Sequence, residues 1–283
     1  MQKQGYRYST IQSCIKSLKP IARRTKLLDP EAVKGYLAGA SISENRKDKL
    51  TQDLARFYKY KGIPFEKPRY RRIEKLPFIP TETEVDQLIS GLGAKTACFL
   101  QLLKETGMRA GEAWNLKWID IDFEKGTVNV TPEKGSRPRQ LKVSNRLLAM
   151  LNAQQRPWIM AFRNLSTNPL KSLDGFRRNF ELARVTLAKK LQNPRIRSIS
   201  FKTLRHFKAT VEYHRTKDIL HVMQLLGHKN IRNTLVYTHL VNFEGDEYVC
   251  KVARTVNEAK NLIEEGFDYV TELDSMRLFR KRK

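Results

Sequence analysis

The sequence has few cysteines, few acidic residues and no long apolar run. Its 283 residues include only 3 cysteines; Cys14, Cys98 and Cys250 lie far apart and lack the spacing of metal ligands. We therefore expect neither a disulfide framework nor a zinc site. No stretch approaches the roughly 18 uninterrupted apolar residues of a membrane-spanning helix, and the first residues lack the apolar segment of a signal peptide. These absences predict a soluble, cytoplasmic protein with no membrane partner.

Acidic residues are also far outnumbered by basic ones. The chain carries 54 Lys and Arg against 29 Asp and Glu, a formal net charge of +25. Such a field concentrates polyanions, so nucleic acid is the first candidate partner. The excess is steep in residues 1–75, which carry 19 Lys and Arg against 7 Asp and Glu. We expect this part to grip DNA and the protein to be associated with the nucleoid.

The length of the chain fits two domains. Residues 1–62 predict a small helical DNA-binding domain, in which Asp29 followed by Pro30 is a helix start signal. Residues 63–80 are rich in proline and basic residues, which predicts a stiff, extended linker. The linker could follow a phosphate backbone or be a solvated tether. Its candidate DNA-binding residues are Lys67, Arg69, Arg71 and Arg72.

Residues 81–243 predict a larger, mainly helical domain with a small antiparallel sheet, so the fold class is mainly α (α+β). The domain opens with a capping box, in which the Thr81 hydroxyl and the Glu84 carboxylate satisfy each other's backbone donors. Further on, the segments TVNV and QLKVS alternate in hydrophobicity and predict a hairpin. The loop between them, KGSRPR, is strongly basic, so we expect Arg137 and Arg139 to contact DNA.

Residues 244–283 predict a tail that continues the second domain. Thr255 and Glu258 repeat the capping-box signal, and Gly266 marks the end of that helix. The segments FDYVTEL and MRLFRKRK then predict a terminal hairpin with a basic end.

Several residues of the second domain suit the chemistry of a phosphodiester. Cleavage without a metal ion needs a nucleophile, groups that stabilise the charge on the non-bridging oxygens, and an acid for the departing alkoxide. Arginine suits the second task, because its planar fork stays charged and donates to two phosphate oxygens. The neighbouring carboxylates Asp120 and Asp122 predict a turn, so we expect no metal and no other cofactor. The candidate catalytic residues are Arg109, Lys134, Lys202, Arg205, His228 and Tyr237.

Tyr237 is the candidate nucleophile, and its phenol needs a nearby base or positive charge to ionise. A phenol with a pKa near 10 is ionised in only about one molecule in a thousand at neutral pH. His228 titrates near neutrality and can assist, while Lys134 on a hairpin loop could protonate the leaving 5′-oxygen. Taken singly, each residue is ordinary, and only their shared order favours catalysis. The histidines not taken as catalytic are His206, His214, His221 and His239.

These segments resemble the tyrosine recombinase, or lambda integrase, family over nearly the whole chain. TGMRAGEAWNLKW is similar to the segment with the family's first catalytic arginine, which matches Arg109. The basic hairpin is similar to the element that carries the catalytic lysine, which matches Lys134. The family's His-x-x-Arg appears as Lys202-Thr203-Leu204-Arg205, so Arg205 matches the second arginine and Lys202 stands in place of the histidine. This lysine and the tail also resemble archaeal integrases.

The last block, LLGHKNIRNTLVYTHL, is similar to the family segment in which a histidine precedes the nucleophile; these residues match His228 and Tyr237. The resemblance implies a two-domain clamp on double-stranded DNA attachment sites. Tyr237 would form a 3′-phosphotyrosyl link, which a 5′-hydroxyl reseals without ATP. Four protomers would exchange strands through a Holliday junction, with residues 244–283 as a candidate contact between protomers. At Lys202, a phosphate contact and a base of lowered pKa both stay open.

Two other function classes remain open. A type IB topoisomerase would use similar tyrosine chemistry without pairing two DNA sites, and a non-catalytic DNA-binding protein would lack a catalytic group. The spacing of the last block and the small basic N-terminal domain favour recombination, and only the exchange at Lys202 departs from the family's catalytic set. A helix-turn-helix transcription factor would explain only the charge.

Overall fold

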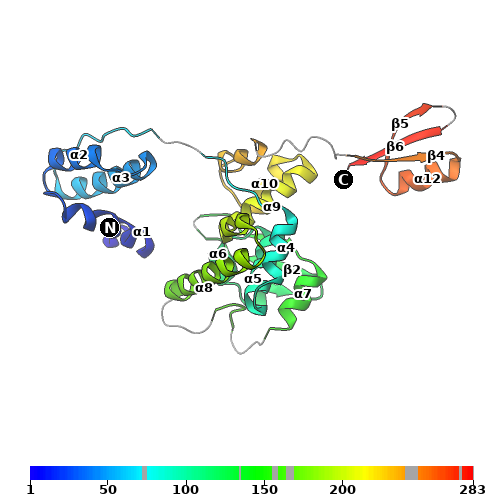
Figure 1. Cartoon of the computed structure of the whole chain (residues 1–283), viewed down its shortest axis with the longest axis horizontal. Coiled ribbons are helices and arrows are strands. Elements are labelled where there is room, and N and C mark those ends of the chain that lie inside the picture. Colours follow the sequence, from blue (N-terminus) through cyan, green and yellow to red (C-terminus); the bar gives the residue numbers. More distant parts are fainter. Residues whose placement is uncertain are drawn as a thin grey trace. The chain divides into compact units, whose positions relative to one another are not determined.

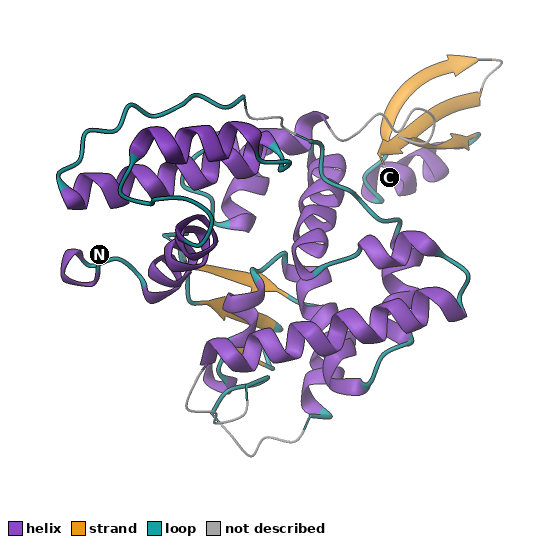
Figure 2. Ribbon diagram, turned by 60° about the vertical axis from the view of Figure 1, so that its left-hand side comes forward, coloured by secondary structure: helices purple, strands orange, loops and turns teal. Residues whose placement is uncertain are grey.

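The computed structural model describes residues 1–71, 75–133, 135–154, 159–163, 169–239, 248–273 and 276–282. The predicted site residues Arg72 and Lys134 lie outside these ranges. The chain divides into two compact units, Met1–Lys75 and Leu76–Lys283 (Figure 1). Helices make up most of both units, and the strands are few and short (Figure 2).

The first unit is helical, as predicted. After the 3-10 turn Gln2–Gln4 it contains α1 (Tyr8–Ala22), α2 (Pro30–Gly39) and α3 (Glu44–Lys61). The Asp29 carboxylate caps α2 by accepting from the backbone N–H groups of Glu31 and Ala32, at 3.0 and 3.1 Å. Apolar side chains from the three helices form the core of this unit: Ile21, Val33, Leu37, Leu50, Leu54 and Tyr58.

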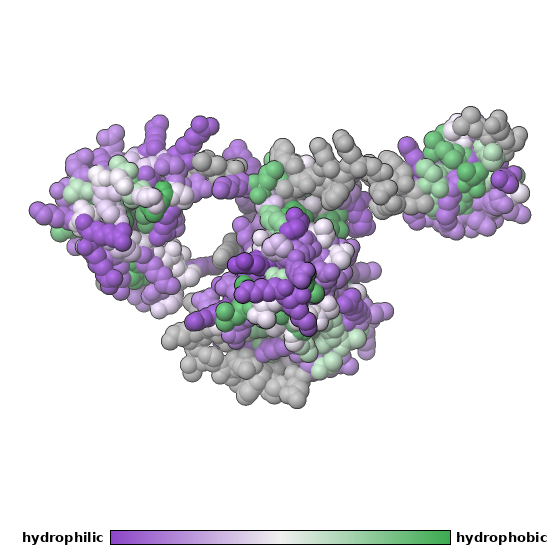
Figure 3. Space-filling view, in the orientation of Figure 1, coloured by the Kyte–Doolittle hydropathy of each residue, from purple (hydrophilic) through white to green (hydrophobic). Residues whose placement is uncertain are grey.

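Residues 63–71 and 75–80 contain neither helix nor strand, which fits the proline-rich composition of this segment. Hydrophilic side chains cover most of the visible face of the helical unit (Figure 3). The predicted DNA-binding residues in this part that the structure describes are exposed: Lys67, Arg69 and Arg71.

The second unit is built around α5 (Ala94–Thr106), whose side chains are buried along most of its length. It packs against α4 (Glu82–Ser90), α7 (Asn145–Asn152) and α9 (Phe201–Thr216). At its centre Phe99 is fully buried and makes edge contacts with Phe162, Phe176 and Phe201. The other helices described before residue 240 are α6 (Ala110–Trp114), α8 (Pro169–Lys190), α10 (Ile219–Leu226) and α11 (Arg232–Leu235), with the 3-10 helices Trp118–Asp120, Pro194–Ser198 and Val236–His239. None of the helices described is long and apolar enough to cross a membrane.

The predicted capping box at the start of α4 is present: Glu84 N–H donates to the Thr81 hydroxyl at 3.2 Å, and Thr81 N–H donates to the Glu84 carboxylate at 2.8 Å. The same carboxylate accepts from Arg195 Nε at 2.6 Å. Glu84 therefore joins the start of α4 to the 3-10 helix Pro194–Ser198.

The predicted hairpin is also present, in a three-stranded antiparallel sheet of order β1-β2-β3. Its strands are β1 (Ile121–Asp122), β2 (Thr127–Val130) and β3 (Arg139–Lys142), with Val128 opposite Leu141. Asp122 forms the predicted turn, because its carboxylate accepts from the backbone N–H groups of Glu124 and Lys125. The fold is thus mainly helical with a small antiparallel sheet, as the sequence predicts.

The C-terminal module, residues 248–282, combines a sheet of order β4-β6-β5 with one helix. It contains β4 (Tyr248–Ala253), α12 (Val256–Glu264), β5 (Asp268–Leu273) and β6 (Met276–Arg282). The terminal hairpin is confirmed in β5 and β6, whereas the sequence did not predict β4. The module has a core of its own, formed by Ala253, Ala259, Leu262, Phe267 and Phe279. It also exposes apolar side chains, visible as green atoms in Figure 3.

Candidate active site

Arg109 lies in the turn between α5 and α6. Gly107 ends α5 in the left-handed region at φ 61°, and Arg109 precedes the first residue of α6. The Glu112 carboxylate accepts from the backbone N–H of Arg109 and from its Nη1, both at 3.0 Å. The Arg109 side chain remains 26% exposed. Glu112 therefore fixes the guanidinium while part of it still faces solvent.

Glu112 also holds the basic hairpin loop. Its side chain is fully buried and accepts from Arg139 Nη2 at 2.7 Å, from the Ser136 hydroxyl at 2.9 Å and from Glu133 N–H at 3.4 Å. Burial alone would raise the pKa of Glu112, but the bonds from Arg139, from the Arg109 N–H and from Ser136 outweigh it and lower the pKa to about 2. One carboxylate thus joins α6 to the residues on both sides of position 134.

The sequence predicts that Arg139 contacts DNA, but the structure buries its side chain. Its side chain is 6% exposed and forms the ion pair with Glu112. Arg137 is exposed, as a DNA-contacting residue would be, and its backbone N–H donates to Gly227 O at 3.0 Å. Gly227 has φ 67°, and a Cβ there would lie 2.9 Å from Arg137 O. The hairpin loop is therefore also tied to the end of α10.

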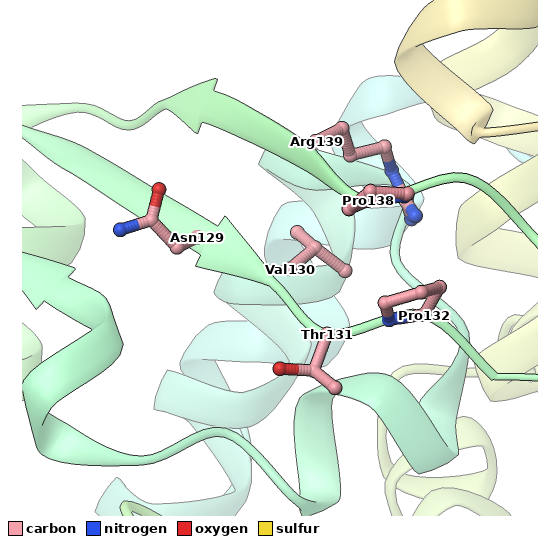
Figure 4. A pocket seen from close by; sticks show the side chains of 6 residues that line it. All are labelled: Asn129, Val130, Thr131, Pro132, Pro138 and Arg139. Atoms are coloured by element: carbon pink, nitrogen blue, oxygen red, sulfur yellow. The ribbon is translucent and has the colours of Figure 1, made fainter.

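A hollow of about 420 Å³ lies at the loop end of β2 and β3 (Figure 4). Its lining residues are Asn129, Val130, Thr131, Pro132, Pro138 and Arg139. Of the predicted catalytic residues that the structure describes, none lines this hollow. It is therefore separate from the group of predicted catalytic side chains described below.

Arg205 lies in the first half of α9 and is 7% exposed. Its Nη1 donates to Gly107 O at 2.6 Å and its Nη2 donates to Leu226 O at 2.7 Å. These bonds join α9 to the C-terminal ends of α5 and α10. Burial and the nearby charge of Arg109 lower the pKa of Arg205 to about 10, so the guanidinium stays charged at neutral pH.

His228 follows Gly227 at the end of α10 and is 9% exposed. Its Nδ1 lies 2.9 Å from the Thr234 hydroxyl. Burial, with the positive charges of Arg205 and Arg109, lowers the pKa of His228 to about 4. The imidazole is therefore neutral at neutral pH.

Tyr237 lies in the 3-10 helix Val236–His239 and is 2% exposed. Its ring packs among Ala209 of α9 and Val222 and Leu226 of α10. Burial raises the pKa of Tyr237, and this effect outweighs the opposing charges of Arg205 and Arg109. Both guanidinium groups therefore act on the phenol, so the fold brings the two arginines and the tyrosine into one electrostatic neighbourhood.

The sequence placed His206 beside Arg205 as a residue that could support the catalytic group, without predicting it as catalytic. Its Nδ1 lies 3.0 Å from the Tyr237 hydroxyl, and the two ring centroids are 5.7 Å apart. Burial, with the charges of Lys202 and Arg205, lowers the pKa of His206 to about 4. Lys202 itself is exposed in the first turn of α9. Since His206 lies one helical turn after Lys202 and next to Arg205, its position was the available signal.

The structure thus gathers four of the six predicted catalytic residues: Arg109, Arg205, His228 and Tyr237. Lys202 lies on the same helix as Arg205, and Lys134 is outside the described residues. In the described ranges, no three His, Cys, Asp or Glu side chains are grouped as metal ligands.

Comparison with known proteins gives the family. The sequence model of the Phage integrase family matches residues 81–243, more than half of the chain. The chain belongs to this family. Among its relatives is the tyrosine recombinase XerA of Pyrococcus furiosus, 29% identical over 224 residues that cover 76% of this chain and 75% of the relative. XerA of Pyrococcus horikoshii is 30% identical over 197 residues, 67% of each chain. The protein is therefore an enzyme of the tyrosine recombinase type.

Solved structures share the fold. The Tn1549 transposon integrase in complex with transposon right end DNA has a TM-score of 0.63 at 15% identity, covering 93% of this chain and 95% of the other. A lambda integrase dimer bound to a COC′ core site also has a TM-score of 0.63, at 18% identity and with 86% and 92% covered. At these identities the likeness concerns the fold.

Proposed function

We propose that this recombinase cleaves and rejoins double-stranded DNA through a 3′-phosphotyrosyl intermediate on Tyr237, without a metal ion or ATP. The observation that carries the proposal is the shared electrostatic neighbourhood of the Tyr237 phenol, Arg109 and Arg205. A phenol that feels the charge of two guanidinium groups suits attack on a phosphate whose non-bridging oxygens gain charge. The DNA-bound integrases that share the fold support DNA as the substrate.

The two arginines and His228 would bind the scissile phosphate. A guanidinium has five N–H donors, so the bonds of Arg205 to two carbonyls fix its plane and leave capacity for phosphate oxygens. Arg109 is held by Glu112 but partly exposed, which suits a ligand arriving from solvent. His228 is neutral, so one ring nitrogen can carry a proton to donate to the phosphate while Nδ1 stays near Thr234.

Two lysines complete the proposed chemistry. We assign Lys134 as the acid that protonates the leaving 5′-oxygen, supported by the contacts of its neighbours Glu133 and Ser136 with Glu112. We assign Lys202 as a contact to a DNA phosphate, because it is exposed at the start of α9. Four exposed basic residues would contact the DNA backbone: Lys67, Arg69, Arg71 and Arg137.

Tyr237 is buried, with 2% of its surface exposed. A phosphate therefore reaches the hydroxyl only after the 3-10 helix Val236–His239 or the groups around it move. Once the tyrosyl link forms, it conserves the phosphodiester, so a 5′-hydroxyl from a partner strand can reseal the DNA. We propose that four protomers pair two attachment sites and exchange strands through a Holliday junction, with the C-terminal module contributing to contacts between protomers.

Trapping the covalent intermediate tests this proposal. A pool of nicked duplexes with a randomised centre is incubated with the protein, and the DNA that becomes covalently attached is sequenced to give a defined substrate. Cleavage beside the nick releases a short fragment, which prevents religation. We expect a covalent adduct with the native protein and none with Tyr237→Phe. The matched control is Tyr213→Phe, which alters another tyrosine packed in the same cluster and should leave the adduct yield unchanged.

The acid role of Lys134 has a separate test. A 5′-thiolate is a good leaving group and needs little protonation, so a substrate with sulfur at the bridging position should restore cleavage by Lys134→Ala. Equal defects of this variant on the oxygen and sulfur substrates would refute the assignment.

A further inference from the structure

The contact between His206 and Tyr237 joins two side chains that the fold holds from different directions. His206 extends from α9, whereas Tyr237 lies in the 3-10 helix Val236–His239. The Nδ1 to Oη distance is 3.0 Å, within the range of a hydrogen bond. Ala209 lies three residues after His206 on the same helix and packs against the tyrosine. The phenol is therefore fixed at both its ring and its hydroxyl.

The protonation states of the pair favour a neutral phenol held by His206 over deprotonation of the phenol by His206. Burial, with Lys202 and Arg205, lowers the pKa of His206 to about 4, and burial raises the pKa of Tyr237 above its ordinary value of 10. Moving the phenol proton to an imidazole whose pKa is lowered to about 4 is strongly unfavourable. The hydrogen bond between a neutral imidazole and a neutral phenol is thus the stable form.

We propose that His206 is a positioning residue that holds the Tyr237 hydroxyl in its buried site, so that this contact has to break before the phenol reaches a DNA phosphate. The proposal rests on the tyrosyl chemistry proposed above. Arg205 is adjacent to His206 and Lys202 lies one turn before it. A phosphate bound by these cations would therefore act close to the contact, which links release of the nucleophile to occupation of the site.

Two variants of His206 test the proposal. His206→Phe keeps an aromatic ring but removes the nitrogen that bonds the phenol. His206→Asn keeps a hydrogen-bonding group at the position of Nδ1. The first measurement is acetylation of the Tyr237 hydroxyl by N-acetylimidazole without DNA, followed by peptide mass spectrometry. The second is the single-turnover rate of adduct formation on the nicked duplex. Melting temperatures establish folding, and His206→Leu replaces His206→Phe where the latter does not fold.

We expect both rates to rise about five-fold in His206→Phe, the factor that corresponds to about 1 kcal/mol for one hydrogen bond, and to stay near the native value in His206→Asn. Equal rates in the two variants would overturn the proposal, and so would slower reaction of His206→Phe than of His206→Asn. The acetylation arm needs no DNA chemistry. If the native protein forms no adduct on the nicked duplex, the proposed function is refuted. The acetylation rates still decide the role of His206.

Discussion

Replacing Glu112 with glutamine should destabilise the second unit more than any exposed ion-pair change. The buried carboxylate is the counter-charge for Arg109 and Arg139 and also accepts from Ser136. Glutamine keeps the size of the side chain but removes its charge. It leaves Arg139, with 6% of its side chain exposed, without an anionic partner. Arg205 also loses a nearby negative charge that raises its pKa.

Two arguments give the magnitude. The pKa of Glu112 falls from its ordinary 4.5 to about 2, and a difference of this size corresponds to about 3 kcal/mol at 1.36 kcal/mol for each unit. Removing one partner of a buried ion pair costs about 3 to 5 kcal/mol. For a domain of this size that free energy lowers the melting temperature by roughly 6 to 20 °C.

Calorimetry of Glu112→Gln and of a matched control measures this effect. The control is Glu265→Gln, which removes the same charge from the exposed pair with Lys251 and should leave the melting temperature within error. Adding Arg139→Met to Glu112→Gln should recover part of the loss, because the buried charge of Arg139, which had lost its anionic partner, is then removed. A melting temperature for Glu112→Gln equal to that of the control would refute Glu112 as the residue that holds the cationic group together.

Further expectations concern the backbone, pH and the C-terminal module. Gly227→Ala should lower the free energy of unfolding by more than Gly126→Ala in urea titrations, since both have positive φ (about 1 to 2 kcal/mol of strain) but only Gly227 also meets the hairpin loop; equal losses would contradict this. Glu212 is a buried carboxylate of α9 that forms ion pairs with Lys208 and Arg215. The pKa values of His228 and Glu212 are lowered to about 4 and about 2, so the unfolded chain binds protons at higher pH than the native one. The free energy of unfolding should therefore fall from about pH 6.5 to pH 2, and a flat profile would be evidence against these environments. Truncation after Asn242 should leave DNA binding intact and weaken assembly on DNA in sedimentation experiments; unchanged assembly would oppose a contact role.

The sequence predicted those parts of the fold that depend on local signals. Two such features are the capping box of Thr81 and Glu84 and the turn at Asp122. Both are formed by residues close in sequence, so the sequence alone predicts them. The hairpin of β2 and β3 follows from alternating hydrophobicity and a basic loop. By contrast, β4 pairs with β6, more than twenty residues later, and no local pattern specifies that partner.

The site was predicted to the extent that its residues carry motifs. Arg109, Arg205 and Tyr237 were placed by ordered segments, and the fold brings them together. The roles of Arg139 and His206 depend on tertiary packing. The sequence predicted that Arg139 contacts DNA, because its ion pair with the buried Glu112 forms only once the hairpin is folded. His206 gains its partner only when the chain after α10 returns to α9.

Identification of the residue that carries the DNA tests the central claim most directly. The native protein is trapped on the nicked duplex and digested with nuclease and protease, and the peptide that retains a nucleotide is sequenced by mass spectrometry. The account predicts the phosphate on the oxygen of Tyr237, linked to the 3′ side of the break. A nucleotide on any other side chain, or cleaved DNA with no covalent protein, would contradict it.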